Sequence, residues 1–71
     1  MIEYNIELIW DDEASVWVAE NNDIPIALES ESLDYLIERV KISVPELLDL
    51  NSNNHKNIVL NFKMERQTVV A

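Results

Sequence analysis

Residues 33–48 read LDYLIERVKISVPELL, and their apolar side chains recur with the period of an α-helix. Counted from Leu33, these side chains stand at offsets 0, 3, 4, 7, 11, 14 and 15, which places them in one stripe along a helix. Ser32 is a good amino-terminal cap, because its hydroxyl can accept a bond from a free backbone amide. Asp34 in the first turn is favoured by the helix dipole. The sequence therefore predicts one long helix that begins at Leu33.

Pro45 lies within this stripe and conflicts with an ideal helix. Proline has no amide hydrogen to donate, and its ring clashes with the carbonyl one turn earlier. The four residues from Ser43 to Glu46 also have the pattern of a second capping box, a serine followed three positions later by a glutamate. We therefore expect a kink or a break in the helix near Ser43.

A period of two replaces the helical period on both sides of this segment. Alternation of apolar and polar residues is typical of a strand with one buried face. The apolar positions of the two alternating segments are Ile2, Tyr4, Ile6, Leu8 and Trp10, followed near the carboxyl end by Ile58, Leu60, Phe62 and Met64. Each segment is predicted to form a strand.

Two shorter strands are predicted between the first strand and the helix. Residues 15–19 are β-formers that follow the charged residues 11–13, so they are expected to return as the second strand of a hairpin. Residues 26–31 can form a third strand at a sheet edge, because Pro25 cannot donate to a ladder and the nearby charges protect an open edge. The order β-β-β-α-β predicts an α+β protein, with residues 1–71 as a single domain and one helix on one face of a small antiparallel-type sheet.

The net charge of −9 is distributed unevenly along the chain. Residues 1–38 hold eleven of the fourteen acidic residues and no Lys or Arg. A field of this sign repels phosphate and attracts basic proteins, so we expect no direct nucleic-acid binding and a basic protein partner. The alternative is that the acids only keep a small protein soluble.

Residue types exclude several classes of function. The chain has no Cys, which rules out disulfides and thiolate metal sites, and no Gly, which rules out a phosphate-cradling loop. His55 has no nucleophile beside it in sequence, and residues 11–13 lack the spacing of a calcium loop. We predict no enzymatic activity, no cofactor and no metal. The absence of a signal peptide or of a membrane-spanning stretch indicates a cytoplasmic protein.

Trp17 is the aromatic residue that is most informative about binding. Alternation places it on the face opposite Val16 and Val18, so if the helix covers the Val16 face, Trp17 lies on the open face near Ile9. An exposed tryptophan on a sheet is typical of a binding hot spot, of a contact under a loop or of a homodimer interface. We predict a dimer, and a partner-binding site at Trp17, Glu20, Asp23, Glu29 and Glu31.

Five stretches of the sequence together resemble a known family. They read WDDEASVWVA at residues 10–19, DIP at 23–25, LESESLD at 28–34, LIERV at 36–40 and VPELLDLN at 44–51. In these stretches the chain resembles the HicB-like antitoxins, small bacterial domains related to the N-terminal domain of HicB. The resemblance covers residues 4–51 well and the last strand weakly.

The resemblance implies a β-β-β-α-β domain that masks a small, basic, mRNA-cleaving toxin of the HicA type. Two features depart from the family. Many relatives carry glycine where this chain has Ile26, and longer antitoxins add a C-terminal DNA-binding module that is not seen in this sequence, which removes the usual basis for operator binding. We expect an antitoxin-like binding protein; the alternative is a structural or regulatory homodimer without a toxin partner.

Overall fold

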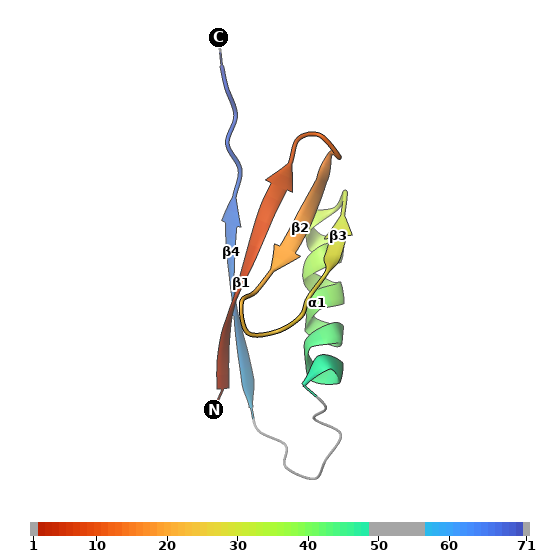
Figure 1. The fold of residues 1–71 in the computed structure, drawn as a ribbon, viewed down its shortest axis with the longest axis vertical. Coiled ribbons are helices and arrows are strands. Elements are labelled where there is room, and N and C mark those ends of the chain that lie inside the picture. The colour runs from red at the N-terminus through yellow and green to blue at the C-terminus, as the bar shows by residue number, and fades with distance from the viewer. Residues whose placement is uncertain (1, 49–56, 71) are drawn as a thin grey trace.

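The computed structural model describes residues 2–48 and 57–70, and it has the predicted element order. The segment around His55 lies outside the described residues. The elements in chain order are β1 (Ile2–Asp11), β2 (Val16–Glu20), β3 (Leu28–Ser30), α1 (Leu33–Leu47) and β4 (Ile58–Glu65) (Figure 1). The predicted α+β class and the β-β-β-α-β order are confirmed.

The four strands form one sheet in the order β3-β2-β1-β4. β2 pairs antiparallel with both β1 and β3, whereas β4 pairs parallel with β1. The expected antiparallel-type sheet is therefore corrected to a mixed sheet. The reason is that α1 runs back along the sheet after β3, so the chain re-enters at the end where β1 begins, as a helical crossover requires.

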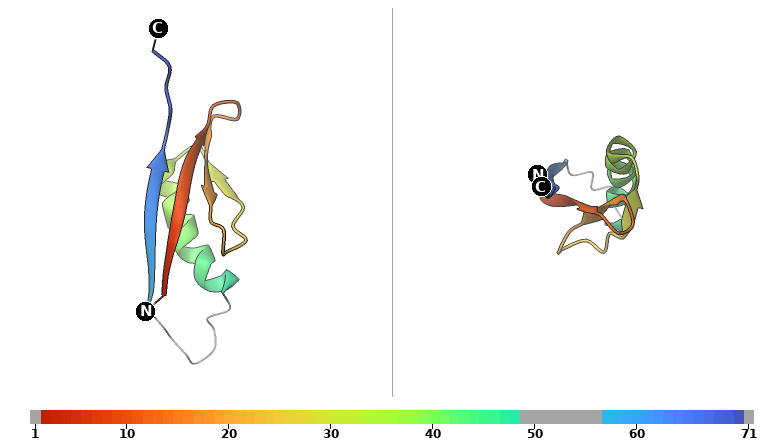
Figure 2. Two further views of the ribbon diagram at one scale, coloured as in Figure 1. Left: turned by 60° about the vertical axis from the view of Figure 1, so that its left-hand side comes forward. Right: turned by 90° about the horizontal axis from the view of Figure 1, so that it is seen from above.

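The core lies between α1 and the two central strands of the sheet, β1 and β2. The most buried side chains, each at most 2% exposed, are Ile6, Leu8, Ala19, Ile24, Leu36, Val40 and Val44. Leu36, Val40 and Val44 are spaced by four, so they form the predicted apolar stripe of α1. The helix packs mainly on β3 and β2, and the view from above shows β4 at the far side of the sheet from α1 (Figure 2).

The two ends of α1 bear on predictions made from the sequence. Ser32 caps the amino end as predicted, since its Oγ accepts a hydrogen bond of 3.2 Å from the Tyr35 amide. Of the kink or break expected near Ser43, the break is wrong, because α1 continues through Ser43 and Pro45 to Leu47. Pro45 lies in the last turn, where the Leu48 amide still bonds to the Val44 carbonyl at 3.0 Å, so the turn closes around it.

The β1–β2 hairpin is closed by the side chain of Asp11. One of its carboxylate oxygens accepts hydrogen bonds from the Glu13 amide at 3.0 Å and the Ala14 amide at 3.3 Å. An aspartate that bonds its own backbone two residues ahead replaces the glycine or asparagine of a tighter turn. Ser15 completes the turn with a positive φ of 55°. Among the described residues, no helix is long and apolar enough to cross a membrane.

Candidate functional site

Trp17 lies on the face of the sheet that α1 covers, not on the open face. The strand register pairs Trp17 with Trp10 and Ala19 with the buried Leu8. Because cross-strand partners share a face, Trp17 points to the same side as the core, where it packs against the buried cluster. The expectation that Trp17 lies beside Ile9 on the open face is therefore wrong. Val18 is the residue opposite Ile9.

Trp17 and Trp10 form an aromatic pair at the hairpin end of the core. Their ring centroids are 5.4 Å apart with an interplanar angle of 65°, which is an edge-to-face contact. The guanidinium of Arg66 lies 4.1 Å from the Trp10 ring centroid and 5.9 Å from that of Trp17. This stack ties the chain just after β4 to the hairpin, so both tryptophans have a structural role here.

The uncovered face of the sheet is acidic. It carries the exposed carboxylates of Glu3, Glu7, Glu20, Glu29 and Glu65, which the strand register places on the side opposite the core. We call this surface the open face. Lys63 is the basic residue that the described strands place there, and the half-buried Ile9, Val16, Val18 and Val59 lie among the acids.

Two rows of side chains across the open face define its pattern. In one row Glu20, Glu7 and Lys63 follow one another across β2, β1 and β4. In the next row Val18 and Ile9 lie in the middle, with Glu29 on β3 and Glu65 on β4 at the two ends. The open face therefore has a small apolar centre with acidic residues around it.

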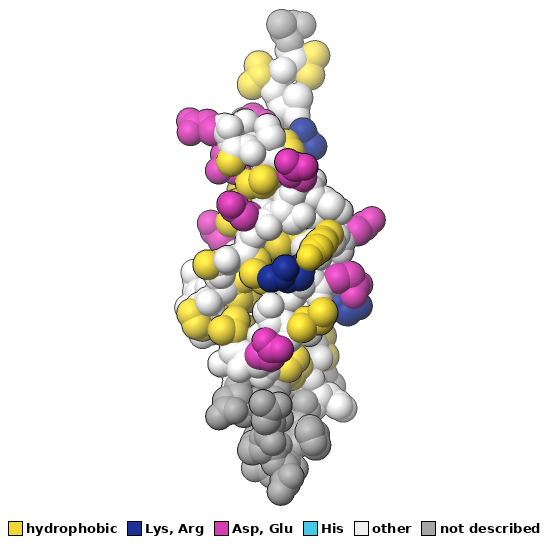
Figure 3. All heavy atoms as spheres, turned by 90° about the vertical axis from the view of Figure 1, so that its right-hand side faces the viewer, with side chains coloured by type: hydrophobic (Ala, Val, Ile, Leu, Met, Phe, Trp, Pro, Cys, Tyr) yellow, Lys and Arg dark blue, Asp and Glu magenta, His cyan; other side chains and the backbone are white. Residues whose placement is uncertain are grey.

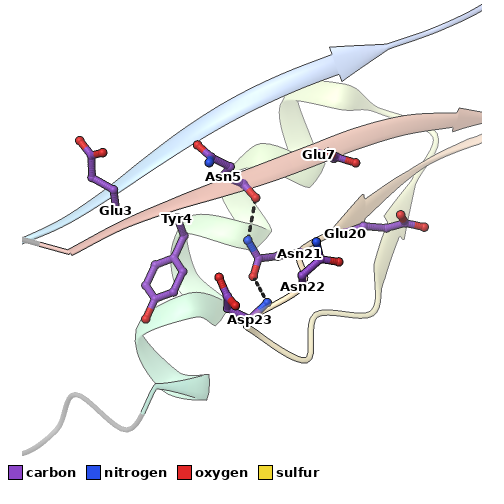
Figure 4. A pocket seen from close by; sticks show the side chains of 8 residues that line it. All are labelled: Glu3, Tyr4, Asn5, Glu7, Glu20, Asn21, Asn22 and Asp23. Atoms are coloured by element: carbon purple, nitrogen blue, oxygen red, sulfur yellow. Dashed lines mark hydrogen bonds between the residues drawn. The ribbon is translucent and has the colours of Figure 1, made fainter.

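A shallow polar pocket of about 240 Å³ opens at one side of these rows (Figure 4). Asn21 shapes it: its Nδ2 donates to the Asn5 carbonyl at 2.6 Å, and its Oδ1 accepts from the amides of Asp23 at 2.7 Å and Ile24 at 2.8 Å. These bonds fasten the loop after β2 to β1. The loop therefore holds Asp23 close to the acids of the open face.

The acids around this pocket do not form a metal site. The carboxylates of Glu3, Glu7, Glu20 and Asp23 line the pocket but do not converge on one point (Figure 4). Within residues 2–48 and 57–70, no group of three or more acidic or histidine side chains could hold a metal ion. Carboxylates spread over a surface in this way attract a basic surface rather than enclose a small ion.

The predicted acidic site residues are brought together only in part. Glu20 and Glu29 lie on the open face, and Asp23 borders its pocket. Glu31 is exposed but lies beyond the end of β3, outside these rows. Glu3 and Glu7 were missed as site residues, although the alternation of β1 already placed both on the face opposite its apolar side chains.

The surface on the α1 side of the molecule differs from the open face. There acidic, basic and hydrophobic side chains are interspersed (Figure 3). The basic residues of α1 have partners on the helix itself, since Lys41 bonds Glu38 at 3.0 Å and Arg39 lies over the Tyr35 ring. The asymmetry of charge seen along the sequence is thus also an asymmetry between two sides of the fold.

In the part of the chain that the structure describes, the fold and this acidic face define a small α+β protein whose helix covers one face of the sheet and leaves the other open. Residues 3–71 match the family described as a domain of unknown function, DUF1902, and the chain belongs to that family. It is also similar to a solved structure, the hypothetical protein TTHA1013 of the extremely thermophilic bacterium Thermus thermophilus. The two are 34% identical, with a TM-score of 0.76 over 96% of this chain and 99% of the other. No curated protein matches the chain.

Proposed function

We propose that this protein is an antitoxin-like binding protein whose open face masks a small basic toxin. The observation that carries the proposal is the composition of that face, where exposed glutamates outnumber the one opposed base, Lys63, in the described strands. Such a face attracts a protein surface built to hold RNA, because that surface must itself be basic. The resemblance of residues 4–51 to HicB-like antitoxins supports the same class of partner, an mRNA-cleaving protein of the HicA type.

The apolar centre of the open face supports binding in addition to electrostatic attraction. Ile9 and Val18 are opposed across β1 and β2 and are half-buried, with Glu29 and Glu65 beside them in the same row. Stable interfaces commonly have an apolar centre and a polar rim, in which the rim charges speed encounter and the centre slows release. In this proposal the protein acts in the cytoplasm, without catalysis, cofactor or direct contact with nucleic acid.

The test compares two double variants that remove the same charge from different surfaces. Glu7→Gln with Glu20→Gln neutralises the open face, whereas Glu38→Gln with Glu46→Gln neutralises two exposed acids of α1. The partner probe is the product of the neighbouring reading frame, which this proposal requires to be a small basic protein, mixed with each variant in a stopped-flow instrument. We expect slower association only for the open-face variant, with a difference that shrinks as salt rises.

A third variant tests the apolar centre. Val18→Ala should leave the association rate unchanged and speed dissociation, because it shortens a half-buried side chain without changing charge. Equal association rates for the two charge variants at low salt would refute the role of the open face. Retardation of an RNA or DNA duplex by this chain alone at physiological salt would refute it as well.

A homodimeric module without a toxin partner is the second candidate. The observation that favours it is the outer edge of β4, an eight-residue strand that the described strands pair on one side only, with β1. This edge differs from the open face in position, although the side chains of Lys63 and Glu65 belong to both.

A further inference from the structure

The two edges of the sheet differ in how well they are protected against another strand. The β3 edge is three residues long, and it carries the charged Glu29. The β4 edge runs for eight residues from Ile58 to Glu65 with no proline, and its two charged residues, Lys63 and Glu65, are confined to its carboxyl end, so length rather than charge distinguishes it from the β3 edge. Short, charged edges are typical of protected sheets, whereas a long open edge is a template for a further strand.

The backbone groups that β4 leaves free can be identified. The Ile2 amide donates to the Asn57 carbonyl at 3.0 Å, so the odd-numbered residues of this segment turn their backbone groups toward β1. Backbone groups alternate in direction along a strand. The amides and carbonyls of Ile58, Leu60, Phe62 and Met64 therefore point to the open edge.

The chain after β4 continues this edge beyond the rest of the sheet (Figure 1). Residues 66–70 project along the direction of β4, and the molecule is 54 Å long but only 19 × 18 Å across. Val69 and Val70 in this segment are 89% and 87% exposed. A β-branched pair with almost complete exposure favours pairing with another strand over free solution.

We propose that a second copy of this chain pairs with residues 58–70 in antiparallel orientation, with Met64 on the two-fold axis. This register pairs all thirteen residues, because 64 is the midpoint of the segment, so Val69 meets Val59 and Val70 meets Ile58 of the second copy. Met64, which is 55% exposed, becomes central to the contact. The inference does not depend on the proposed toxin partner.

The charges on this segment select the same register. With Met64 on the axis, Lys63 faces Glu65 of the second copy, and the two-fold symmetry makes this pair twice. Moving the axis by one residue instead places Lys63 opposite Lys63 or Glu65 opposite Glu65, and opposed like charges destabilise a ladder. Moving it to Phe62 leaves Lys63 opposite Asn61 and the residues after 66 without strand partners.

The resulting dimer has an eight-stranded sheet with β4 and its copy at the centre. A two-fold axis through an edge-to-edge strand pair keeps the two copies' faces on the same sides. Both copies of α1 therefore cover one side, and the two open faces join on the other. The groove of about 350 Å³ between α1 and β4, lined by Val44, Pro45, Ile58, Leu60 and Phe62, then lies next to its equivalent across the axis.

Disulfide trapping tests this register directly. The chain has no cysteine of its own, so a single introduced cysteine can form a disulfide only with the same residue of a second copy. Residues opposed in a hydrogen-bonded antiparallel pair have Cα atoms about 5.5 Å apart, within the range that a disulfide can bridge. Under mild oxidation we expect Met64→Cys to form a covalent dimer, and Lys63→Cys and Glu65→Cys to form little. A maximum at position 62, 63 or 65 would overturn the register. Equal trapping at every position would overturn the ordered interface.

Light scattering on the unmodified chain tests the dimer itself. At high micromolar concentration we expect twice the 8.3 kDa mass of one chain. Met64→Pro should reduce the mass to that of a monomer, because it removes an amide that points to the open edge and spares the bonds to β1. Met64→Ala keeps this amide and is the matched control, expected to remain a dimer. A monomeric parent chain, or a dimeric Met64→Pro, would overturn the proposal.

A charge swap provides a second route that does not rely on proline. Glu65→Lys places two lysines opposite each other twice in the dimer, so the dissociation constant should rise roughly tenfold or more. Adding Lys63→Glu to the same chain reverses both charges and should restore most of the affinity. A single variant that dimerises like the parent, or a double variant that gives no recovery, would show that these two residues do not face each other.

Discussion

Glu20→Gln should make this protein more stable. Glu20 is opposed to Glu7 across the β1–β2 pair, and both side chains are exposed on the open face. Like charges directly opposite in a ladder destabilise it, and one cross-strand pair contributes about 0.2 to 1 kcal/mol. Removing the charge of Glu20 relieves this repulsion without touching the core.

Lys63 allows the size of the effect to be bounded. Glu7 is opposed to Glu20 on one side and to Lys63 on the other, so the base already compensates part of the repulsion. Because all three groups are exposed, screening favours the lower half of the range, about 0.2 to 0.5 kcal/mol. For a domain of this size that free energy corresponds to a rise in Tm of about 1 to 4 °C.

Urea unfolding at low salt and at high salt checks both the sign and the cause. Trp10 and Trp17 pack together at the end of the core, so their fluorescence reports unfolding. At low salt Glu20→Gln should raise the urea midpoint, and the matched variant Lys63→Gln should lower it. Both differences should nearly vanish in 1 M salt, where the screening length is about 3 Å. A Glu20→Gln protein that is less stable than the parent at low salt, or equally stabilised at both salts, would refute this reasoning.

Other variants separate packing from capping and loop effects. Leu36→Ala should lower the free energy of unfolding by about 2 to 5 kcal/mol because Leu36 is fully buried, whereas Ser32→Ala should cost about 1 kcal/mol by removing the cap. Ser43→Ala should change stability by less than about 0.5 kcal/mol, because Ser43 lies inside α1 and caps nothing; urea midpoints compare all three. Trp17→Ala should cost about 2 kcal/mol in the same assay and leave partner association unchanged, since the residue packs on the core side. Asn21→Ala should speed hydrogen exchange at the Ile24 amide, which it bonds at 2.8 Å.

The elements of this fold could be predicted because each depends on a local pattern. The period of two in residues 2–10 and the stripe from Leu33 both describe which side of one segment is apolar, and burial then follows. The cap at Ser32 is equally local. The break expected at Pro45 does not occur: α1 continues to Leu47, and the Leu48 amide bonds to the Val44 carbonyl, although Pro45 itself has no amide hydrogen to donate to the preceding turn.

The faces of β2 and the direction of β4 depend on contacts that no local pattern records. Val16, Trp17 and Val18 are all apolar, so alternation alone does not say which of them faces the core. The hairpin register decides it, through the pairing of Ala19 with Leu8. Parallel pairing of β4 likewise depends on where the crossover returns the chain, which is why the sheet was expected to be antiparallel in type.

The candidate site also combines features that a local pattern predicts with features that depend on contacts between distant strands. The acidity of residues 1–38 was visible in the sequence, and it drew attention to Glu20 and Glu29, which the strand register places on the open face. The rows that join these acids to Glu7 and Glu65 combine strands that are distant in sequence. Glu65 in particular comes from the more basic part of the chain, and only the parallel β1–β4 pairing brings it beside Ile9.

Lys63 links the two proposed interfaces. Within one chain it is opposed to Glu7 on the open face, and in the proposed dimer it also faces Glu65 of the second copy. Attraction to that second carboxylate draws the base away from Glu7 and leaves Glu7 and Glu20 less compensated, which strengthens the open face toward a basic partner. Coupling between two binding equilibria is reciprocal, so a basic partner on the open face must then tighten the dimer by the same factor. Measuring the dimer dissociation constant with and without the basic partner tests this link. Lys63→Gln should abolish the difference if the two interfaces communicate through this side chain.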